Sequence, residues 1–256
     1  MLSLARTVAA LCAALMLAAA VPARAQPDED AKRSEFERML KDYLAEHPEA
    51  IQEALDTLAA RKSAAKTEQR KAAIKTNGRD LFSSPRQVTL GNRMGDVTLV
   101  EFFDYNCGYC KSALADLLDL MKNDPKLKVV LKEYPILGPD SVEAARVAVA
   151  VRMQDAGGAR YLAFHRKLLE SRGHNDKARA LAAAQEAGLD MGRLARDMGS
   201  EEVTKSLDES TRLGEALAIN GTPGYVVGDR VIVGARGERV LKDSVAAARK
   251  PVTSNQ

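Results

Sequence analysis

The chain has 256 residues, 46% hydrophobic and 29% charged, so it is long enough to bury one substantial core and to carry a small appendage. This composition excludes a chain that is disordered throughout. The formal net charge is only +3, from 38 Lys and Arg against 35 Asp and Glu, and gives no basis for binding nucleic acid.

Residues 1–25 predict a secretory signal peptide. Arg6 lies in a short basic start, an apolar segment covers residues 8–21, and Ala23-Arg24-Ala25 is a small-x-small cleavage site. The apolar segment is too short and too rich in alanine to indicate a membrane span. Cleavage after Ala25 would remove two basic residues and no acidic ones, which lowers the net charge from +3 to +1. We therefore expect an exported protein of the periplasm.

Cysteine use indicates redox chemistry. Of the 3 cysteines, Cys12 lies in the expected signal peptide, which leaves Cys107 and Cys110 as a single vicinal pair. Ala9-Ala10-Leu11 before Cys12 is a poor acylation sequence, so a lipoprotein is the weaker alternative. An exported chain of this size with one pair of cysteines and no structural disulfide is expected to use them for chemistry.

Residues 31–78 predict two helices that break at His47-Pro48. Apolar residues recur at helical spacing in both: Phe36, Met39, Leu40, Tyr43 and Leu44, then Ile51, Leu55 and Leu58. Beyond this stripe the second helix is polar until Gly78 stops it. Such short helices cannot bury their stripes alone. We favour an oligomerisation element (residues 31–60, dimer or trimer) on a charged stalk; the alternative is that the helices fold back on their own domain.

The next region predicts a βαβ unit. An edge strand over 87–90 leads through a turn into a central, apolar strand over 97–103. Cys107 opens a helix that ends near residue 123, and a strand over 127–134 follows. The two long strands should be parallel because a helix joins them.

The rest of the chain predicts a helical region and then a ββα unit. Glycines separate five helices over 142–153, 161–169, 177–187, 191–198 and 202–219. Strands over 224–227 and 230–233 are joined by Gly228-Asp229, a hairpin signal, and the last helix covers 238–249.

The two thiols stand on the first turn of a helix, where side chains three apart share a face and can close a disulfide with little strain. The N–H groups of a helix N-terminus favour a thiolate on the first sulfur, which we expect to be exposed. Cys107 is therefore the expected attacking sulfur and Cys110 the resolving one. A lowered pKa mainly makes Cys107 a better leaving group, which indicates reversible thiol–disulfide exchange.

This order of elements resembles the DsbA family of exported oxidoreductases over residues 81–249. Residues 102–110, Phe-Phe-Asp-Tyr-Asn-Cys-Gly-Tyr-Cys, are similar to the active-site segment of its ScsC and Com1-like branch. Gly221-Thr222-Pro223 resembles the cis-proline loop, and residues 36–58 resemble the N-terminal oligomerisation region of ScsC proteins.

The resemblance implies an α/β fold: a thioredoxin fold with an inserted helical domain, preceded by a helical oligomerisation stalk. Four regions are expected after the signal peptide. The oligomerisation region and stalk cover residues 26–78, and the first half of the thioredoxin fold, with the CxxC motif, covers 79–137. The helical insertion covers 138–219, and the second half of the thioredoxin fold, with the cis-proline loop, covers 220–256.

The resemblance also implies roles for residues around the thiols. Glu101 matches the family's buried acid, a proton acceptor for Cys110 through water, although a solvated acid at a strand end is the alternative. Lys132 would face Glu101 from the neighbouring strand and tune it. A cis bond at Thr222-Pro223 would leave backbone groups free to pair with a bound peptide.

Gly108 and Tyr109, together with Thr222, should set the redox poise. This combination resembles the family's isomerases and reductases more than its strong oxidant. An oligomer would also place several catalytic domains around one client protein, which favours rearrangement of wrong disulfides. We therefore expect an oligomeric disulfide isomerase or reductase that needs no cofactor. Its partners would be client proteins with thiols or disulfides and a membrane reductant of the DsbD or ScsB type. The alternative is a dithiol oxidase.

Three other functions are weighed against this one. Structural zinc is disfavoured because one CxxC supplies two of four ligands and His47, His165 and His174 lack paired spacing. Two thiolates suit Cu(I), and ScsC-like proteins are associated with copper tolerance, so copper binding by the reduced form is a secondary candidate. A non-catalytic adhesin or chaperone is a further alternative, which a Cys107→Ser variant would distinguish.

Overall fold

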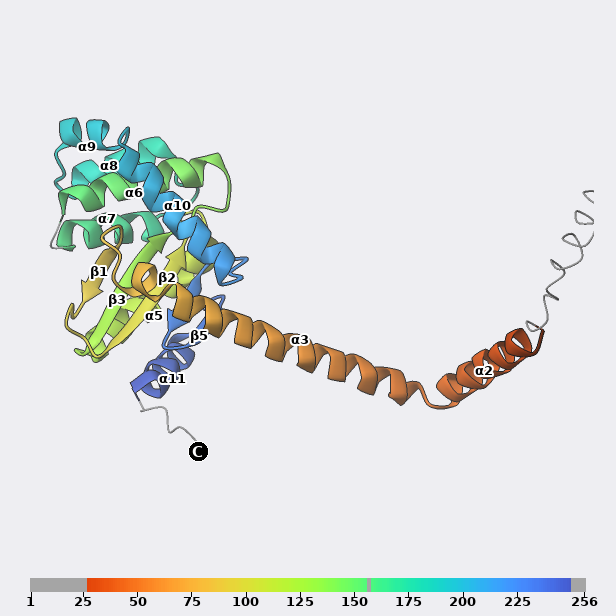
Figure 1. Cartoon of the computed structure of the whole chain (residues 1–256). Coiled ribbons are helices and arrows are strands. Elements are labelled where there is room, and N and C mark those ends of the chain that lie inside the picture. The colour runs from red at the N-terminus through yellow and green to blue at the C-terminus, as the bar shows by residue number, and fades with distance from the viewer. Residues whose placement is uncertain (1–26, 156–157, 250–256) are drawn as a thin grey trace, which may run out of the picture. The chain divides into compact units, whose positions relative to one another are not determined.

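The computed structural model describes residues 27–155 and 158–249 (Figure 1). The described residues divide into two units, the first ending at residue 62 and the second beginning at residue 63. The expected signal peptide and its cleavage site lie outside the described residues. Among the helices that are described, none combines the length and the apolar character needed to cross a bilayer.

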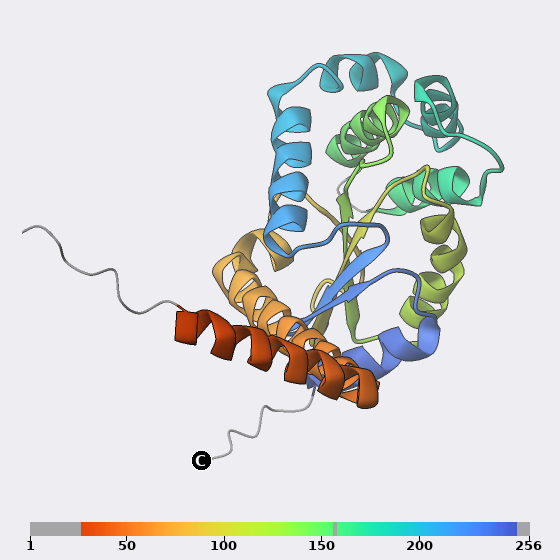
Figure 2. The same cartoon turned by 90° about the vertical axis from the view of Figure 1, so that its right-hand side faces the viewer.

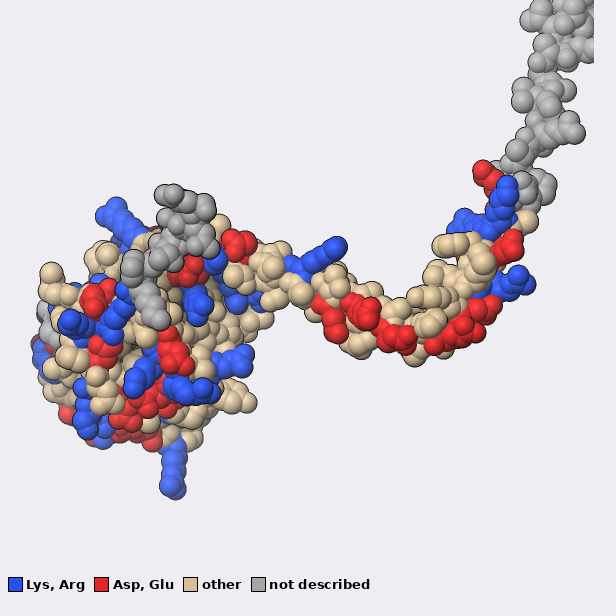
Figure 3. All heavy atoms as spheres, turned by 90° about the horizontal axis from the view of Figure 1, so that it is seen from below, with Lys and Arg blue, Asp and Glu red and all other residues tan. Residues whose placement is uncertain are grey.

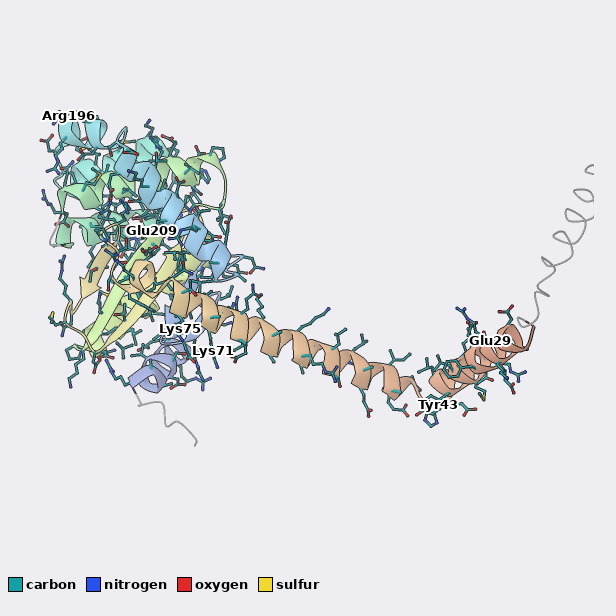
Figure 4. The ribbon with its side chains drawn as sticks, viewed as in Figure 1. Glu29, Tyr43, Lys71, Lys75, Arg196 and Glu209 are labelled. Atoms are coloured by element: carbon teal, nitrogen blue, oxygen red, sulfur yellow. The ribbon has the colours of Figure 1, made fainter. Side chains whose placement is uncertain are left out.

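The first unit consists of α2 (Pro27–Glu46) and the start of α3 (Pro48–Thr76). The helices separate at His47, as predicted, because Pro48 suits the first turn of a new helix. The apolar stripe is solvent-exposed by 43% or more at Phe36, Met39, Leu40, Tyr43, Ile51, Leu55 and Leu58. Acidic side chains line one edge of this unit and uncharged ones the other (Figure 3), and Tyr43 extends from α2 (Figure 4).

A five-stranded sheet organises the second unit. Its strands lie in the order β1-β3-β2-β4-β5, with β2 and β3 parallel and the other pairs antiparallel. The strand bounds are Val88–Gly91 (β1), Val97–Phe103 (β2), Leu127–Glu133 (β3), Gly224–Val227 (β4) and Arg230–Val233 (β5). The predicted βαβ and ββα units are thus confirmed.

Both faces of this sheet are covered. On one face Leu99 and Val129 share a core with α5 (Gly108–Asn123) and α11 (Glu238–Arg249). On the other face Val100 and Phe102 share a core with the end of α3, with α4 (Gly78–Phe82) and with α10 (Glu201–Ala216). Alternate residues of β2 therefore serve different cores, which explains why the strand reads as a nearly continuous apolar run.

The helical insertion follows β3 and is seen beside the sheet in Figure 2. It contains α6 (Pro139–Gln154), α7 (Ala159–Glu170), α8 (Lys177–Glu186), α9 (Met191–Asp197) and α10, close to the predicted ranges. Small side chains of α6, such as Ala144, Ala148 and Val151, are fully buried and let neighbouring helices approach closely.

The end of α3 belongs to the second unit, although the sequence predicts a stalk up to residue 78. Ile74 is 6% exposed and lies in the same core cluster as Leu81, Phe102 and Leu213. Gly78 does not end the helical region either, because α4 begins there after a break at Asn77. The sequence did not predict this contact, because the apolar part of the last turns of α3 is too short to stand out from the polar residues around it.

We predict that Gly214→Ala destabilises the second unit. A Cβ at Gly214 would lie 2.6 Å from Cζ of the Tyr134 ring. This ring is buried and its hydroxyl donates to Ile219 O, so it cannot move away without loss of contacts. The expected loss in free energy of unfolding is about 1–3 kcal/mol, measured by chemical denaturation. Gly192→Ala on α9 is the matched control, because its nearest neighbour would lie at 3.4 Å, and it should be neutral or stabilising. Equal stability of the two variants would contradict this packing argument.

Candidate active site

The loop that carries the first thiol is held by one buried carboxylate. Asp104, 2% exposed, directly follows β2. It accepts hydrogen bonds from Asn106 N at 2.8 Å, from Ser141 Oγ at 2.8 Å, and from the N–H groups of Ile136 and Leu137 at 2.9 and 3.0 Å. The sheet, the loop after β3 and the helical insertion therefore meet directly before the cysteines.

Asn175 provides a second attachment that the sequence did not reveal. Its N–H donates to Asn106 Oδ1 at 2.6 Å, its carbonyl accepts from Asn106 Nδ2 at 3.0 Å, and its side chain donates to Tyr105 O at 2.8 Å. Asn175 is fully buried between α7 and α8. Only its position after a glycine marked it as a turn residue, so no sequence signal linked it to the site.

Cys107 caps α5 and Cys110 lies on its first turn, as predicted, and both thiols are free. Cys107 is 6% exposed and Cys110 1%, so the first sulfur is more buried than expected. The loop at Thr222 covers it, and Cys107 Sγ donates to Thr222 O at 3.1 Å. The exposed surface next to the thiols is formed by Gly108 and by Tyr109, which is 70% exposed.

The two thiols differ strongly in acidity. A hydrogen bond from the Cys110 thiol is the largest cause that lowers the pKa of Cys107, from 9.0 to about 5; burial opposes it, while the Thr222 side chain and the N–H groups of Cys110 and Tyr109 assist. The same hydrogen bond, with burial and the charge of Glu101, raises the pKa of Cys110 far above its usual range. The predicted thiolate on Cys107 is favoured, chiefly by its partner thiol.

Glu101 lies on the face of the sheet that holds the thiols. It is 4% exposed, so it is the buried acid rather than a solvated one. Burial raises its pKa to about 8, the neighbouring Tyr225 hydroxyl lowers it, and a negative charge on Cys107 raises it further. Tyr225 lies opposite Glu101 on β4, although its hydroxyl makes no hydrogen bond of normal geometry within the described residues.

Lys132 does not meet Glu101, so that predicted contact is wrong. In the parallel pair of strands Glu101 lies opposite Leu131, whereas Lys132 lies opposite Phe102. Because successive side chains point to opposite faces, Lys132 lies on the face away from the thiols. Its Nζ instead donates to Glu209 Oε1 on α10 at 2.7 Å and to Asp80 O at 2.8 Å (Glu209 is labelled in Figure 4).

The Thr222–Pro223 peptide bond is cis, as expected. Pro223 O accepts a hydrogen bond from Gly234 N at 2.7 Å, which ties the loop to the end of β5. The Thr222 hydroxyl is buried and has no partner of normal geometry among the described residues, so it is available to donate to a thiolate.

A buried polar chain lies behind the site. Tyr161 Oη donates to Glu133 Oε1 at 2.6 Å and is 3.3 Å from Tyr105 Oη, which lies 3.2 Å from His165 Nδ1. Burial lowers the pKa of His165 to about 3, so this histidine is neutral in the folded protein. His165 thus helps fix Tyr105 next to the active-site loop.

The described part of the chain contains no group of three His, Cys, Asp or Glu side chains arranged to hold a metal ion. The thiols of Cys107 and Cys110 are the candidate ligands for a soft ion such as Cu(I).

Two segments of the chain match known protein families. Residues 98–246 match the family described as a DSBA-like thioredoxin domain, and residues 33–65 match the copper resistance protein ScsC N-terminal domain. The crystal structure of a thioredoxin-like oxidoreductase from Silicibacter pomeroyi DSS-3 is 43% identical, with a TM-score of 0.63, and covers 67% of this chain and 96% of that one.

Two further relatives are more distant. A periplasmic thioredoxin-like protein from Salmonella enterica serovar Typhimurium is 28% identical, with a TM-score of 0.60, and covers 67% of this chain and 95% of that one. The thiol:disulfide interchange protein DsbA of Bordetella pertussis is 28% identical over 140 residues, which are 53% of this chain and 65% of that protein.

We predict that Cys110→Ala raises the pKa of Cys107, because it removes the thiol that stabilises the thiolate most. A lost hydrogen bond to a charged group corresponds to a rise of about 1–2 pH units in the thiolate titration at 240 nm, from a wild-type midpoint of about 5. Cys110→Ser keeps a donor and should shift the midpoint less. An unchanged midpoint in Cys110→Ala would show that other groups hold the thiolate.

We predict that Glu101→Gln removes a pH-dependent penalty on stability. The pKa of Glu101 rises from 4.5 to about 8 on folding, so the native state binds the extra proton over this window and wild type loses stability as pH rises through it. The free energy of unfolding of the Gln variant, relative to wild type, should therefore increase from pH 4.5 to pH 8. A pH-independent difference would contradict the raised pKa. Burial also raises the pKa of Glu133, so Glu133→Gln should change in the same direction and provides a second test of the argument.

Proposed function

Because the chain belongs to the DSBA-like thioredoxin family of thiol:disulfide oxidoreductases, we propose that it reshuffles and reduces disulfides of client proteins as an oligomer. The observation that carries this proposal is the unequal pair of thiols, in which Cys107 has a pKa of about 5 and Cys110 stays protonated. A stable thiolate favours the reduced form of the pair, which is the form that attacks client disulfides, and it equally makes the oxidised pair a stronger oxidant. The acidity of Cys107 therefore supports thiol–disulfide exchange, and the choice of an isomerase rests on the exposed apolar stripe of residues 36–58.

The first step is attack of the Cys107 thiolate on a client disulfide, which forms a mixed disulfide and releases a client thiolate. We place the client peptide beside the Thr222–Pro223 loop, which lies next to Cys107. Either another client thiolate attacks the client sulfur and releases Cys107, which is isomerisation, or Cys110 attacks Cys107, which is reduction. In the second case the pair becomes a disulfide and the client leaves as a dithiol.

Glu101 is the proposed proton acceptor for Cys110. While Cys107 is a thiolate, its charge helps keep the pKa of Glu101 at about 8. Formation of the mixed disulfide removes this charge, which favours release of the Glu101 proton to water, although burial remains the largest cause of the raised pKa. The carboxylate that results then accepts the Cys110 proton as Cys110 attacks. Glu101 therefore becomes a proton acceptor at the stage at which Cys110 attacks the mixed disulfide. We further propose that Lys132 acts only as a structural partner of Glu209, and that Gly108, Tyr109 and Thr222 tune the redox poise.

The exposed stripe on residues 36–58 supports an oligomer as the active form. Seven large apolar side chains stay open to solvent in the single chain, and the match to the ScsC N-terminal domain covers the same stretch. A second copy of the chain, as a dimer or trimer through residues 31–60, would cover them. Several heads on one client favour reshuffling over a single oxidation, whereas a dithiol oxidase is the alternative.

We propose the periplasm as the site of action, with export by residues 1–25 and cleavage after Ala25. The resemblance to a periplasmic thioredoxin-like protein supports this location. An isomerase there requires a supply of electrons, for which a membrane reductant of the DsbD or ScsB type is the proposed partner. Binding of Cu(I) by the two thiols is a second candidate function, favoured by the match to a copper resistance protein; it predicts tight binding to the reduced form alone.

We predict that Leu55→Glu combined with Leu58→Glu yields monomers and abolishes isomerase activity. The control combines Gln52→Glu with Thr57→Glu, which adds the same charge at exposed polar positions of the same helix. Light scattering gives the assembly state, and reactivation of a scrambled disulfide substrate gives the activity. A chain that begins at Ser63 keeps the second unit and should behave like the Leu variant.

Two outcomes would decide against an oligomeric isomerase. If the Leu variant still reshuffles disulfides as a monomer, the stripe has another purpose. If wild type and variant both fail to reshuffle but rapidly oxidise a reduced substrate, the protein is a dithiol oxidase.

A further inference from the structure

The last turns of α3 contact the segment that leads into the Thr222–Pro223 loop. Arg70 Nε donates to Leu217 O at 3.0 Å, and Arg70 Nη2 donates to Ala218 O at 2.8 Å. One turn further along α3, Ile74 lies in the same buried cluster as Leu217. The helix that the sequence marks as a spacer therefore reaches the chain on which the substrate loop depends.

Residues 217–219 need such support because they follow the end of α10 in an unfavourable conformation. Ala218 has a φ of +50°, in the left-handed region that residues with a Cβ rarely adopt. Backbone bonds from Ala218 N to Glu215 O and from Ile219 N to Gly214 O close the helix end. The carbonyls of 217 and 218 point outward to Arg70, and Ile219 O accepts from Tyr134 Oη at 3.1 Å.

Residues 217–219 precede the active-site loop at Thr222–Pro223 by only a few residues. The chain continues from Ile219 to Thr222, whose carbonyl accepts the Cys107 thiol proton at 3.1 Å, and then to Pro223. A shift of the segment would move the loop against which a client peptide is bound.

We propose that Arg70 is a positioning residue for client binding: it fixes the left-handed segment at Leu217 and Ala218 and thereby places the Thr222–Pro223 loop opposite Cys107. The inference rests on the proposed function, because it assigns this loop to the client. It also makes the end of α3 part of the catalytic unit, on the same continuous helix that carries Ile51, Leu55 and Leu58.

Arginine suits this role because its planar guanidinium presents donors in a fixed fork, which matches two successive carbonyls. Lysine offers a flexible point charge and can satisfy both carbonyls less well. The contact is made to main-chain atoms, so it constrains the path of the backbone whatever the side chains at 217 and 218 are.

The test compares Arg70→Gln and Arg70→Lys with wild type in the whole chain. Lys71→Gln is the matched control, because Lys71 (Figure 4) is the next residue on α3 and forms ion pairs with Glu68 and Asp229 at 3.2 and 3.8 Å. Each protein is assayed for reduction of a peptide disulfide of about ten residues and of hydroxyethyl disulfide, which is too small to make extended contacts with the Thr222–Pro223 loop. Hydrogen exchange of the peptide spanning 217–226 reports on the loop without any activity.

For Arg70→Gln we expect an approximately tenfold rise in KM for the peptide with kcat within twofold, a rate with hydroxyethyl disulfide within twofold, and about tenfold faster exchange over 217–226. Arg70→Lys should fall between Gln and wild type, and Lys71→Gln should match wild type. Equal losses on both substrates, or unchanged exchange and KM in Arg70→Gln, would overturn the positioning role. If wild type itself reduces neither disulfide, the proposed function fails instead. If Arg70→Gln does not fold, Arg70→Lys decides by the same criteria.

Discussion

The hydrogen bond between the two thiols is the interaction on which the chemistry of this protein depends. It places the negative charge on Cys107 and the proton on Cys110, and each assignment affects a third group, Glu101. The site is therefore a coupled set of three acids in a space that excludes most water. Because each charge affects the pKa of the other members, a change at one sulfur alters the proton affinity of the other two groups.

Sheet geometry decides which groups join this set. The alternation of β2 sends Glu101 to the face of α5 and the neighbouring Phe102 to the face of α10. The register with β3 then excludes Lys132, whose charge is balanced at Glu209 on the far side. A buried acid can keep a raised pKa only where no cation reaches it, so the separation of Glu101 from Lys132 is a condition for its proposed role.

Much of this arrangement could be predicted from the sequence, and the exceptions have physical causes. Strand and helix ranges, the parallel pair and the position of the two cysteines at the start of α5 follow from periodicity and from the CxxC spacing, which are local signals. Lys132 was misplaced because adjacency of strands was known but their register was not. Asn175 and Arg70 act over sequence separations of 69 and 147 residues, through backbone atoms, and leave no pattern in the residues themselves. The burial of Cys107 likewise depends on a distant loop.

The way Asp104 holds the loop after β3 has an evolutionary consequence. The carboxylate binds the main-chain N–H groups of Ile136 and Leu137, while their side chains, 41% and 49% exposed, point away from this contact. Such side chains can be exchanged over generations without moving the cysteines. The side chains of this loop can therefore change without loss of the contacts that hold Asp104 in front of the cysteines.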